Sequence, residues 1–105
     1  MKDYQIALCT APDQATAEKL AEMLVKERLA ACVNVVPAIT SIYQWQGEIE
    51  KESEVLMIIK TEAQLVGSIG DLLDEEHPYE VPELISCSIE QASHAYLEWL
   101  DNCLK

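Results

Sequence analysis

The segment 54–61 constrains the fold more than any other part of the chain, because its residues are apolar in both positions of the strand alternation. In an extended strand, successive side chains point to opposite faces of the sheet. Both faces are apolar here: Val55, Met57 and Ile59 on one, and Leu56 and Ile58 on the other. A chain this short can cover one sheet face with helices. The second face needs cover from outside, which predicts self-association.

Composition indicates one compact domain with an acidic surface. The 105 residues are 50% hydrophobic, which suits a single domain over residues 1–105. Lys and Arg number 7 against 19 Asp and Glu, for a formal net charge of -12. Such a charge repels phosphate backbones and anionic lipid headgroups. We therefore expect neither a nucleic-acid partner nor a membrane partner.

The amino-terminal segment and the cysteines both favour a cytoplasmic location. Segment 1–11 has an acidic residue directly after Lys2 and too short an apolar run for an export signal. No apolar segment is long enough to cross a bilayer. The cysteines show no C-x-x-C pairing, so we expect free thiols in a reducing compartment. They are Cys9, Cys32, Cys87 and Cys103.

Hydrophobic periodicity and turn residues predict the order βαββαβ followed by a terminal helix. The expected strands are 5–11, 32–36 continuing after Pro37 into 39–46, 50–61 and 84–89. The expected helices are one capped by Asp13 and extending to Leu29, one around 65–73, and one over 93–104. This order is typical of the α+β ferredoxin-like sandwich, in which two helices cover one face of an antiparallel four-stranded sheet.

The middle strands form a long hairpin, with its turn expected at Gly47 and Glu48. Its outer end carries Tyr43 and Trp45 on one face, and a single chain would cover these rings poorly. We interpret them as interface residues, with ordinary core packing as the alternative.

Six separated motifs resemble the CutA divalent-cation-tolerance family. They are CTAP at 9–12, LAACVN at 29–34, TSIYQWQG at 40–47, MIIKT at 57–61, HPYEVPE at 77–83 and YLEW at 96–99. The resemblance runs nearly end to end. It implies a cytoplasmic ferredoxin-like homotrimer that binds metal and is associated with tolerance of copper and other divalent cations.

The resemblance also implies a metal site at two of these motifs. Cys9 and His77 correspond to ligand positions of the family, and copper and zinc favour thiolate and imidazole ligands. Some members have a histidine before the HPY motif, where this chain has Glu76, a harder ligand that should weaken copper binding. We predict Cys9, Glu76 and His77 as ligands of Cu²⁺ or of another divalent cation such as Zn²⁺. Cys32 is a secondary candidate.

These ligand candidates have simpler explanations. A histidine at a helix end can interact with the last carbonyls of the helix, and cysteines in strands are commonly small buried hydrophobes.

A small-molecule sensor that binds its ligand in clefts between subunits is the alternative function. Lys60 ends an apolar strand, and Tyr79 and Glu83 belong to the rigid HPY loop, so polar groups could converge where subunits meet. An interface ion pair between Lys60 and a glutamate is the simpler interpretation. The chain has no Gly-rich phosphate loop and no nucleophile motif, and we expect no enzyme activity.

Overall fold

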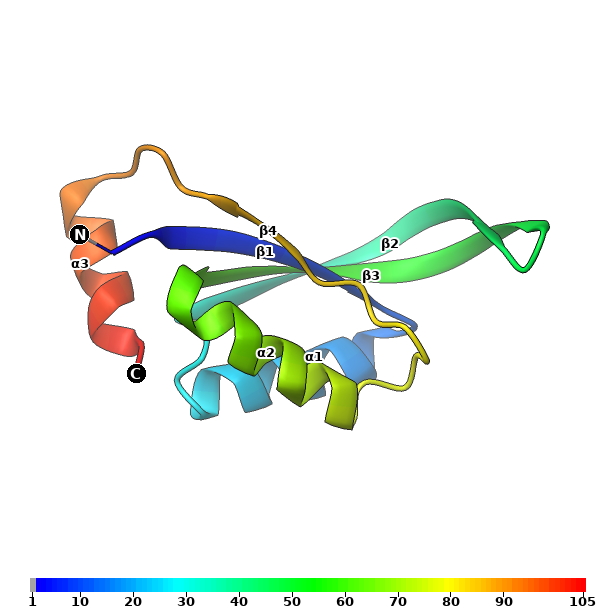
Figure 1. Cartoon of the computed structure of the whole chain (residues 1–105), viewed down its shortest axis with the longest axis horizontal. Helices are drawn as coiled ribbons and strands as arrows, with labels where there is room; N and C mark the ends of the chain where they lie inside the picture. Colours follow the sequence, from blue (N-terminus) through cyan, green and yellow to red (C-terminus); the bar gives the residue numbers. More distant parts are fainter. Residues whose placement is uncertain (1) are drawn as a thin grey trace.

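The computed structural model describes residues 2–105 and contains one antiparallel four-stranded sheet and three helices (Figure 1). The elements are β1 (Tyr4–Ala11), α1 (Gln14–Lys26), β2 (Cys32–Trp45), β3 (Glu48–Glu62), α2 (Ala63–Glu76), β4 (Ile85–Ser88) and α3 (His94–Cys103). The sheet order is β2-β3-β1-β4. The predicted βαββαβ order with a terminal helix is confirmed. No helix in residues 2–105 combines the length and apolar character needed to cross a membrane.

The first and third helices begin where the sequence predicts, whereas α2 begins at Ala63, before the expected 65–73. The Asp13 carboxylate accepts a hydrogen bond from the backbone N–H of Thr16 at 2.7 Å, which satisfies a free donor of the first turn of α1. Ser93 caps α3 in the same way, accepting from the N–H of Tyr96 at 3.2 Å. A hydroxyl or carboxylate immediately before an amphipathic run thus marks the start of α1 and α3, whereas Glu62 before α2 makes no side-chain cap hydrogen bond.

The end of α1 differs from the sequence expectation. Leu29 continues the apolar spacing, but the helix ends at Lys26 because Arg28 adopts a left-handed conformation with φ 60. The N–H of Leu29 then donates to the carbonyl of Leu24 at 2.9 Å. Leu29 still reaches the core, so the spacing identified a buried residue and not a helical one.

The β2–β3 hairpin is long and bent. β2 is an edge strand, so Pro37 removes no ladder hydrogen bond from the sheet interior. The pairing register shifts between Val36 and Ile39, as expected from a break at Pro37, and Ala38 has φ 60. At the tip, Gln46 and Gly47 both have positive φ, 51 and 83, the pattern of a two-residue type I′ turn.

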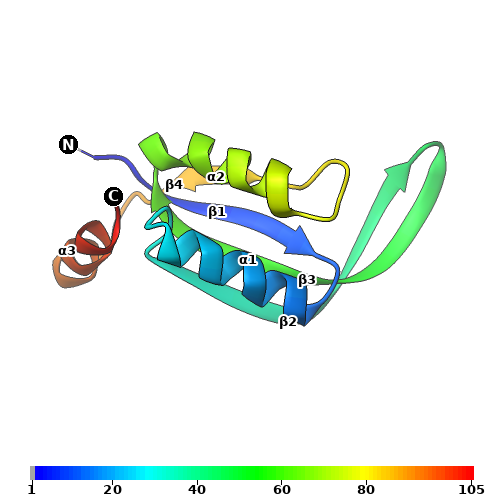
Figure 2. The same ribbon diagram turned by 90° about the horizontal axis from the view of Figure 1, so that it is seen from below.

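One face of the sheet is covered by α1 and α2, which lie side by side beneath it (Figures 1 and 2). Met57 and Ile59 of β3 point toward these helices and have 0% exposure. They pack in one cluster with apolar residues of both helices: Leu20, Leu24, Ile69 and Leu73. This cluster is the hydrophobic core, and its burial is the main stabilising contribution of the fold.

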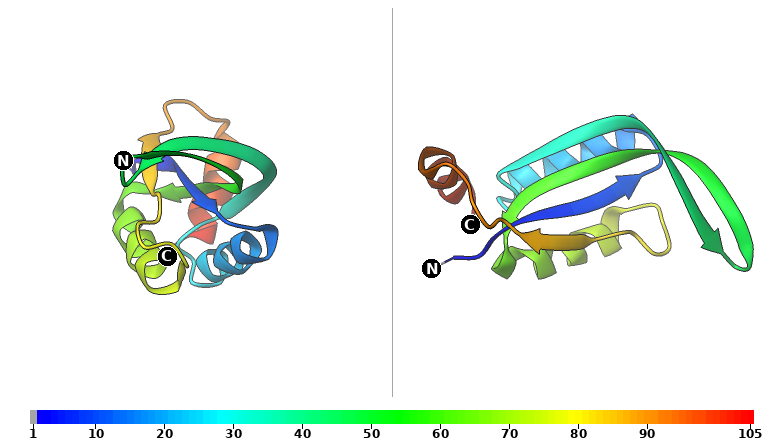
Figure 3. Two further views of the ribbon diagram at one scale, coloured as in Figure 1. Left: turned by 90° about the vertical axis from the view of Figure 1, so that its right-hand side faces the viewer. Right: turned by 90° about the horizontal axis from the view of Figure 1, so that it is seen from above.

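The opposite face has no helix over it, as the right-hand view of Figure 3 shows. We call this the open face. Register pairs Leu8 with both Ile58 and Ile85, and cross-strand partners share a face. Ile85 is 59% exposed and Val36 is 37% exposed. The apolar members of the open face include Ile6, Leu8, Val36, Ile39, Leu56, Ile58 and Ile85.

The third helix, α3, lies beyond one end of the sheet (Figure 1) and is held there by Arg28. The guanidinium of Arg28 donates to the carbonyls of Asn102 at 2.9 Å, Cys103 at 3.1 Å and Leu104 at 3.0 Å. These are carbonyls at the helix end that lack intrahelical partners. Leu100 and Leu104 pack in a second, smaller cluster with Ala31.

We expect Met57→Ala to lower the free energy of unfolding by about 2–5 kcal/mol, because it leaves a cavity in the core. Urea unfolding at fixed protein concentration measures this change. Ile42→Ala is the control, since Ile42 is 67% exposed and should cost less than about 0.5 kcal/mol. Equal losses in the two variants would contradict the assignment of the core to the helix side of β3.

Candidate functional site

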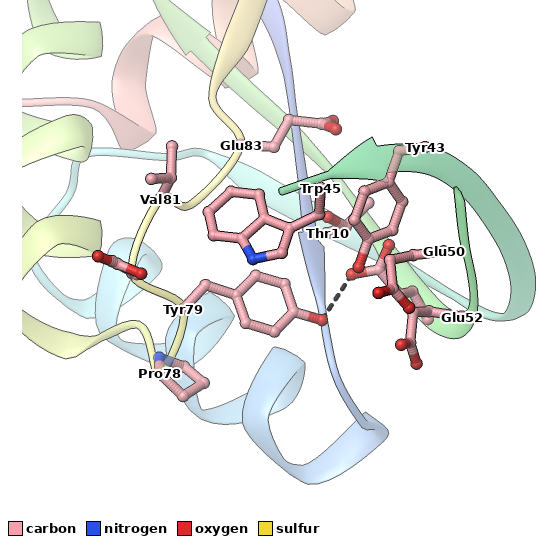
Figure 4. Close-up of a pocket in the computed structure, with 11 residues that line it drawn as sticks. Thr10, Tyr43, Trp45, Glu50, Glu52, Pro78, Tyr79, Val81 and Glu83 are labelled. Carbon is pink, nitrogen blue, oxygen red and sulfur yellow. Dashed lines mark hydrogen bonds between the residues drawn. The ribbon is translucent and has the colours of Figure 1, made fainter. Parts of the chain in front are cut away.

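A pocket of about 550 Å³ opens between the outer part of the β2–β3 hairpin and the loop that follows α2 (Figure 4). Thr10, at the end of β1, also contributes to it. The hairpin residues are Tyr43, Trp45, Glu50, Glu52 and Glu54. The loop residues are Pro78, Tyr79, Glu80, Val81 and Glu83.

Local structure explains why these side chains meet. Glu50, Glu52 and Glu54 occupy alternate positions of β3, so they point to the same face. Tyr43 lies directly opposite Glu50 in the strand pairing. On the other side, prolines at 78 and 82 restrict the loop backbone to extended conformations. The pocket therefore forms between a strand face and a stiff connection.

The pocket is strongly acidic. Five glutamates line it, and its lining contains no Lys, Arg or His. Glu54 is only 7% exposed, and its Oε2 accepts a hydrogen bond from the Tyr79 hydroxyl at 2.5 Å. Burial and then the charge of Glu54 raise the pKa of Glu83, and burial and the Glu54 hydrogen bond raise the pKa of Tyr79. The site therefore favours a positively charged occupant.

Aromatic rings form the rest of the wall. In Figure 4 the rings of Trp45 and Tyr79 occupy the middle of the pocket, with Tyr43 toward the hairpin. Trp45 is 41% exposed and Tyr43 is 42% exposed, so both keep an accessible ring surface. The face of an aromatic ring carries partial negative charge and attracts cations.

His77 fixes the loop to β1. The residue is 7% exposed, and its Nδ1 accepts from the backbone N–H of Tyr79 at 3.0 Å. Because Nδ1 accepts, Nε2 carries the proton and donates to the carbonyl of Thr10 at 2.8 Å. Both ring nitrogens therefore have protein partners. The simpler sequence interpretation was an interaction of the side chain with the last carbonyls of its helix. Both ring nitrogens instead bond to Thr10 and Tyr79, and only the backbone N–H of His77 donates to the carbonyl of Leu73.

The other two predicted metal ligands have different environments. Cys9 is 0% exposed on the helix side of β1, and burial, then the charges of Glu83 and Glu54, raises the pKa of its thiol to about 12. Glu76 is exposed at the last position of α2. Among residues 2–105, no group of three or more His, Cys, Asp and Glu side chains is arranged to hold a metal ion. A single chain thus offers no preformed metal centre, and the set Cys9, Glu76 and His77 stays a prediction.

The proposed cleft residues are only partly brought together. Tyr79 and Glu83 both line the pocket, but Lys60 does not. Lys60 lies on the open face near the far end of β3, where its ammonium group donates to the side-chain oxygen of Asn34 and lies 3.9 Å from the sulfur of Cys32. Within residues 2–105 of one chain, Lys60 forms no ion pair with a glutamate. Any meeting of Lys60 with the pocket would need a second copy.

Sequence reasoning missed the hairpin carboxylates Glu50, Glu52 and Glu54 as site residues. Their alternation was visible in the sequence and indicates one shared strand face. The missing information was what faces them, since the approach of the loop around Tyr79 is a tertiary contact. Tyr43 and Trp45, interpreted as interface residues, line the same pocket.

The profile of the CutA1 divalent ion tolerance protein family matches residues 5–103. This chain belongs to that family. The human Protein CutA is 49% identical over 94 residues, which are 90% of this chain and 52% of the human protein. The chain therefore spans about half the length of that relative. The divalent-cation tolerance protein CutA of Thermus thermophilus is 42% identical over 91% of this chain and 93% of its own length.

Solved structures of family members match the fold. The Thermus thermophilus divalent cation tolerance protein superposes with a TM-score of 0.94 at 39% identity, over 97% of this chain and 99% of that one. CutA1 from Oryza sativa gives 0.95 at 37% identity, over 98% and 94%. The four-stranded antiparallel sheet with three helices is therefore the family architecture, and the resemblance drawn from the six motifs is confirmed.

The raised pKa of Glu83 predicts a pH-dependent stability change in Glu83→Gln. A carboxyl whose folded pKa is raised above its ordinary 4.5 destabilises the fold once it ionises, so its contribution falls as pH rises. Glu83→Gln should raise both the melting temperature and the free energy of unfolding at pH 7. The gain in free energy should be less than about 1 kcal/mol, because Glu83 is an exposed residue. The gain should shrink below pH 4.5, where Glu83 is protonated in both states. Glu75→Gln, on the exposed surface of α2, is the control; equal gains at pH 4 and pH 7 would contradict the prediction.

Proposed function

We propose that this protein acts in tolerance of divalent metal ions as a cytoplasmic homotrimer that binds copper or another divalent cation such as zinc. One observation carries the proposal: the family model that matches residues 5–103 is that of the CutA1 divalent ion tolerance proteins. Relatives named divalent-cation tolerance proteins support the choice of divalent ions. The four free cysteines fit a reducing compartment.

Self-association is supported by the open face. Leaving its apolar side chains in water forgoes roughly 25 cal/mol for each Å² of apolar surface that a partner could cover. The face is built from all four strands, so an identical chain can cover it without any change in the helix side. The trimeric order is supported by the family resemblance.

Ile58→Lys should therefore dissociate the oligomer, because it places a charge in the middle of the open face. Light scattering at micromolar concentration measures the molar mass, and circular dichroism checks that the chain stays folded. Val25→Lys is the matched control, since Val25 is a β-branched residue 44% exposed on α1. A parent protein that is a folded monomer would contradict the proposal, as would equal dissociation in both variants.

Metal binding at Cys9, Glu76 and His77 would require changes in the observed contacts. Copper and zinc bind thiolate and neutral imidazole, so the Cys9 thiol must lose its proton and a ring nitrogen of His77 must lose a hydrogen bond. Affinity should consequently rise with pH, with protons released on binding.

Calorimetric titration with Cu²⁺ and Zn²⁺ tests the predicted ligands. We expect Cys9→Ser, His77→Ala and Glu76→Ala each to weaken binding, by about 10-fold or more for the first two. His94→Ala is the control, because the side chain of His94 is 94% exposed on α3. Unchanged affinity in Cys9→Ser and His77→Ala, with both variants folded, would exclude this ligand set.

The second candidate function is sensing of a small molecule. It is favoured by a separate observation, the three aromatic side chains Tyr43, Trp45 and Tyr79 in a pocket of about 550 Å³. Cavities of roughly 300–1,000 Å³ with aromatic walls and a few polar groups are typical of small-molecule sites. A metal ion needs no such wall.

A further inference from the structure

Two nucleophilic side chains, Cys32 and Lys60, meet on the open face. They are direct cross-strand partners of β2 and β3, so both side chains point to the same side of the sheet. The ammonium nitrogen of Lys60 lies 3.9 Å from the sulfur of Cys32. Both residues are half-buried, so each keeps some access to solutes. The pair lies outside the pocket and outside the predicted ligand set of Cys9, Glu76 and His77.

Neighbouring contacts hold these two groups in place. The backbone N–H of Ala31 donates to the carbonyl of Lys60 at 2.9 Å, which fixes the strand backbone next to Cys32. The ammonium group of Lys60 donates to the side-chain oxygen of Asn34, which lies two residues after Cys32 on the same face of β2. That hydrogen bond restricts the flexible four-carbon stem of the lysine. The nitrogen is therefore kept near the sulfur.

The distance between nitrogen and sulfur suits transfer of an acyl group from one to the other. A cysteine sulfur is a strong nucleophile and can take an acyl group from a thioester. The carbonyl carbon of the new thioester would be bonded directly to the sulfur of Cys32. A nitrogen 3.9 Å from that sulfur can approach this carbon to the roughly 3–3.5 Å separation of a reactive pair. Neither strand has to move.

We propose that Cys32 and Lys60 form a lysine acylation site, at which a small acyl thioester acylates the cysteine and the lysine then receives the acyl group. In the first step the sulfur of Cys32 attacks the thioester carbonyl. A C–S bond forms to Cys32, the C–S bond to the carrier breaks, and the carrier leaves as a thiol with the proton of Cys32. In the second step Lys60 releases a proton to water, and its uncharged amine attacks the same carbonyl. A C–N bond forms, the bond to Cys32 breaks, and a proton from the amine restores the thiol, so no oxidant or reductant is needed.

Acylation would change the charge of the open face. Among residues 2–105, the strands β1, β2 and β4 contain no Lys or Arg, and Lys51 of β3 belongs to the opposite set of the strand alternation. Lys60 is therefore the one basic side chain that the four described strands place on this face. Acylation of a lysine removes its charge. The modification would thus alter the surface that we expect a second copy to cover.

The test compares Lys60 with Lys51 in the same molecule. Lys51 lies on the same strand, is exposed, and pairs with Ile42 across the hairpin, so exposure alone predicts faster acylation of Lys51 than of the half-buried Lys60. The folded protein is incubated with S-acetyl-N-acetylcysteamine, an uncharged acyl thioester that the net charge of -12 does not repel. Peptide mass spectrometry follows acetylation at each lysine. We expect Lys60 to be acetylated at least about 10-fold faster than Lys51.

Cysteine variants separate transfer through sulfur from direct acylation of the amine. Cys32→Ala should slow acetylation of Lys60 by about 10-fold or more and leave the rate at Lys51 unchanged. Cys87→Ala is the matched control, because Cys87 is an exposed cysteine on the open face, and it should change neither rate. In Lys60→Met the acetyl group should stay on Cys32 as a thioester, which hydroxylamine removes.

A second copy on the open face would cover the pair, so the rates are also measured in Ile85→Asp. Ile85 is 59% exposed on the open face of one chain, so this substitution should oppose assembly without disturbing the core. Light scattering and circular dichroism check its mass and folding. Acetylation of Lys60 that depends on Cys32, in either form, supports the proposal. The proposal is overturned if Cys32→Ala leaves the rate at Lys60 unchanged in both forms, and neither result bears on the calorimetric metal titration.

Discussion

The structure depends on β3, which has apolar side chains on both faces of the sheet, while the helices of the chain cover only one of those faces. On the helix side, Met57 and Ile59 join α1 and α2 in a closed core. On the other side, Leu56 and Ile58 meet only their cross-strand neighbours, and no helix follows. The alternation of the strand makes both sets unavoidable, because a strand that buries residues 55, 57 and 59 must present 56 and 58 to the opposite side. The fold of one chain thus already specifies a surface for another.

The same strand also forms part of the pocket, because its side chains on one face change from acidic to apolar along its length. From Glu50 to Glu54 the open-face positions of β3 are acidic, and from Leu56 to Ile58 they are apolar. The acidic part lies on the outer hairpin, beyond the end of β1, where the loop around Tyr79 approaches it. An apolar surface suited to a second chain and an acidic, aromatic pocket are therefore neighbours on one face. Any assembly through the open face would set how freely the pocket opens to solvent.

The sequence predicted the fold closely and the pocket only in part, for a physical reason. Element order and starts depend on local signals, such as the cap at Asp13 and the break at Pro37, and these are confirmed. The end of α1 was misplaced because Leu29 stays buried after the helix has ended. The pocket joins segments about 25 residues apart in the sequence, as the hydrogen bond from Tyr79 to Glu54 shows. No local sequence pattern predicts such a contact. Lys60 was grouped with Tyr79 from chemistry alone, and one chain keeps them apart.

His77 connects the two proposed sites. Its Nδ1 holds the backbone of Tyr79 while its Nε2 holds β1 at Thr10, and both Tyr79 and Thr10 line the pocket. A metal ion on this ring would have to replace one of these hydrogen bonds, and the position of the Tyr79 ring depends on both. Binding in the pocket fixes Tyr79 and so favours the observed arrangement of His77. The two events would then oppose each other, and linkage requires that each weaken the other's binding by the same factor.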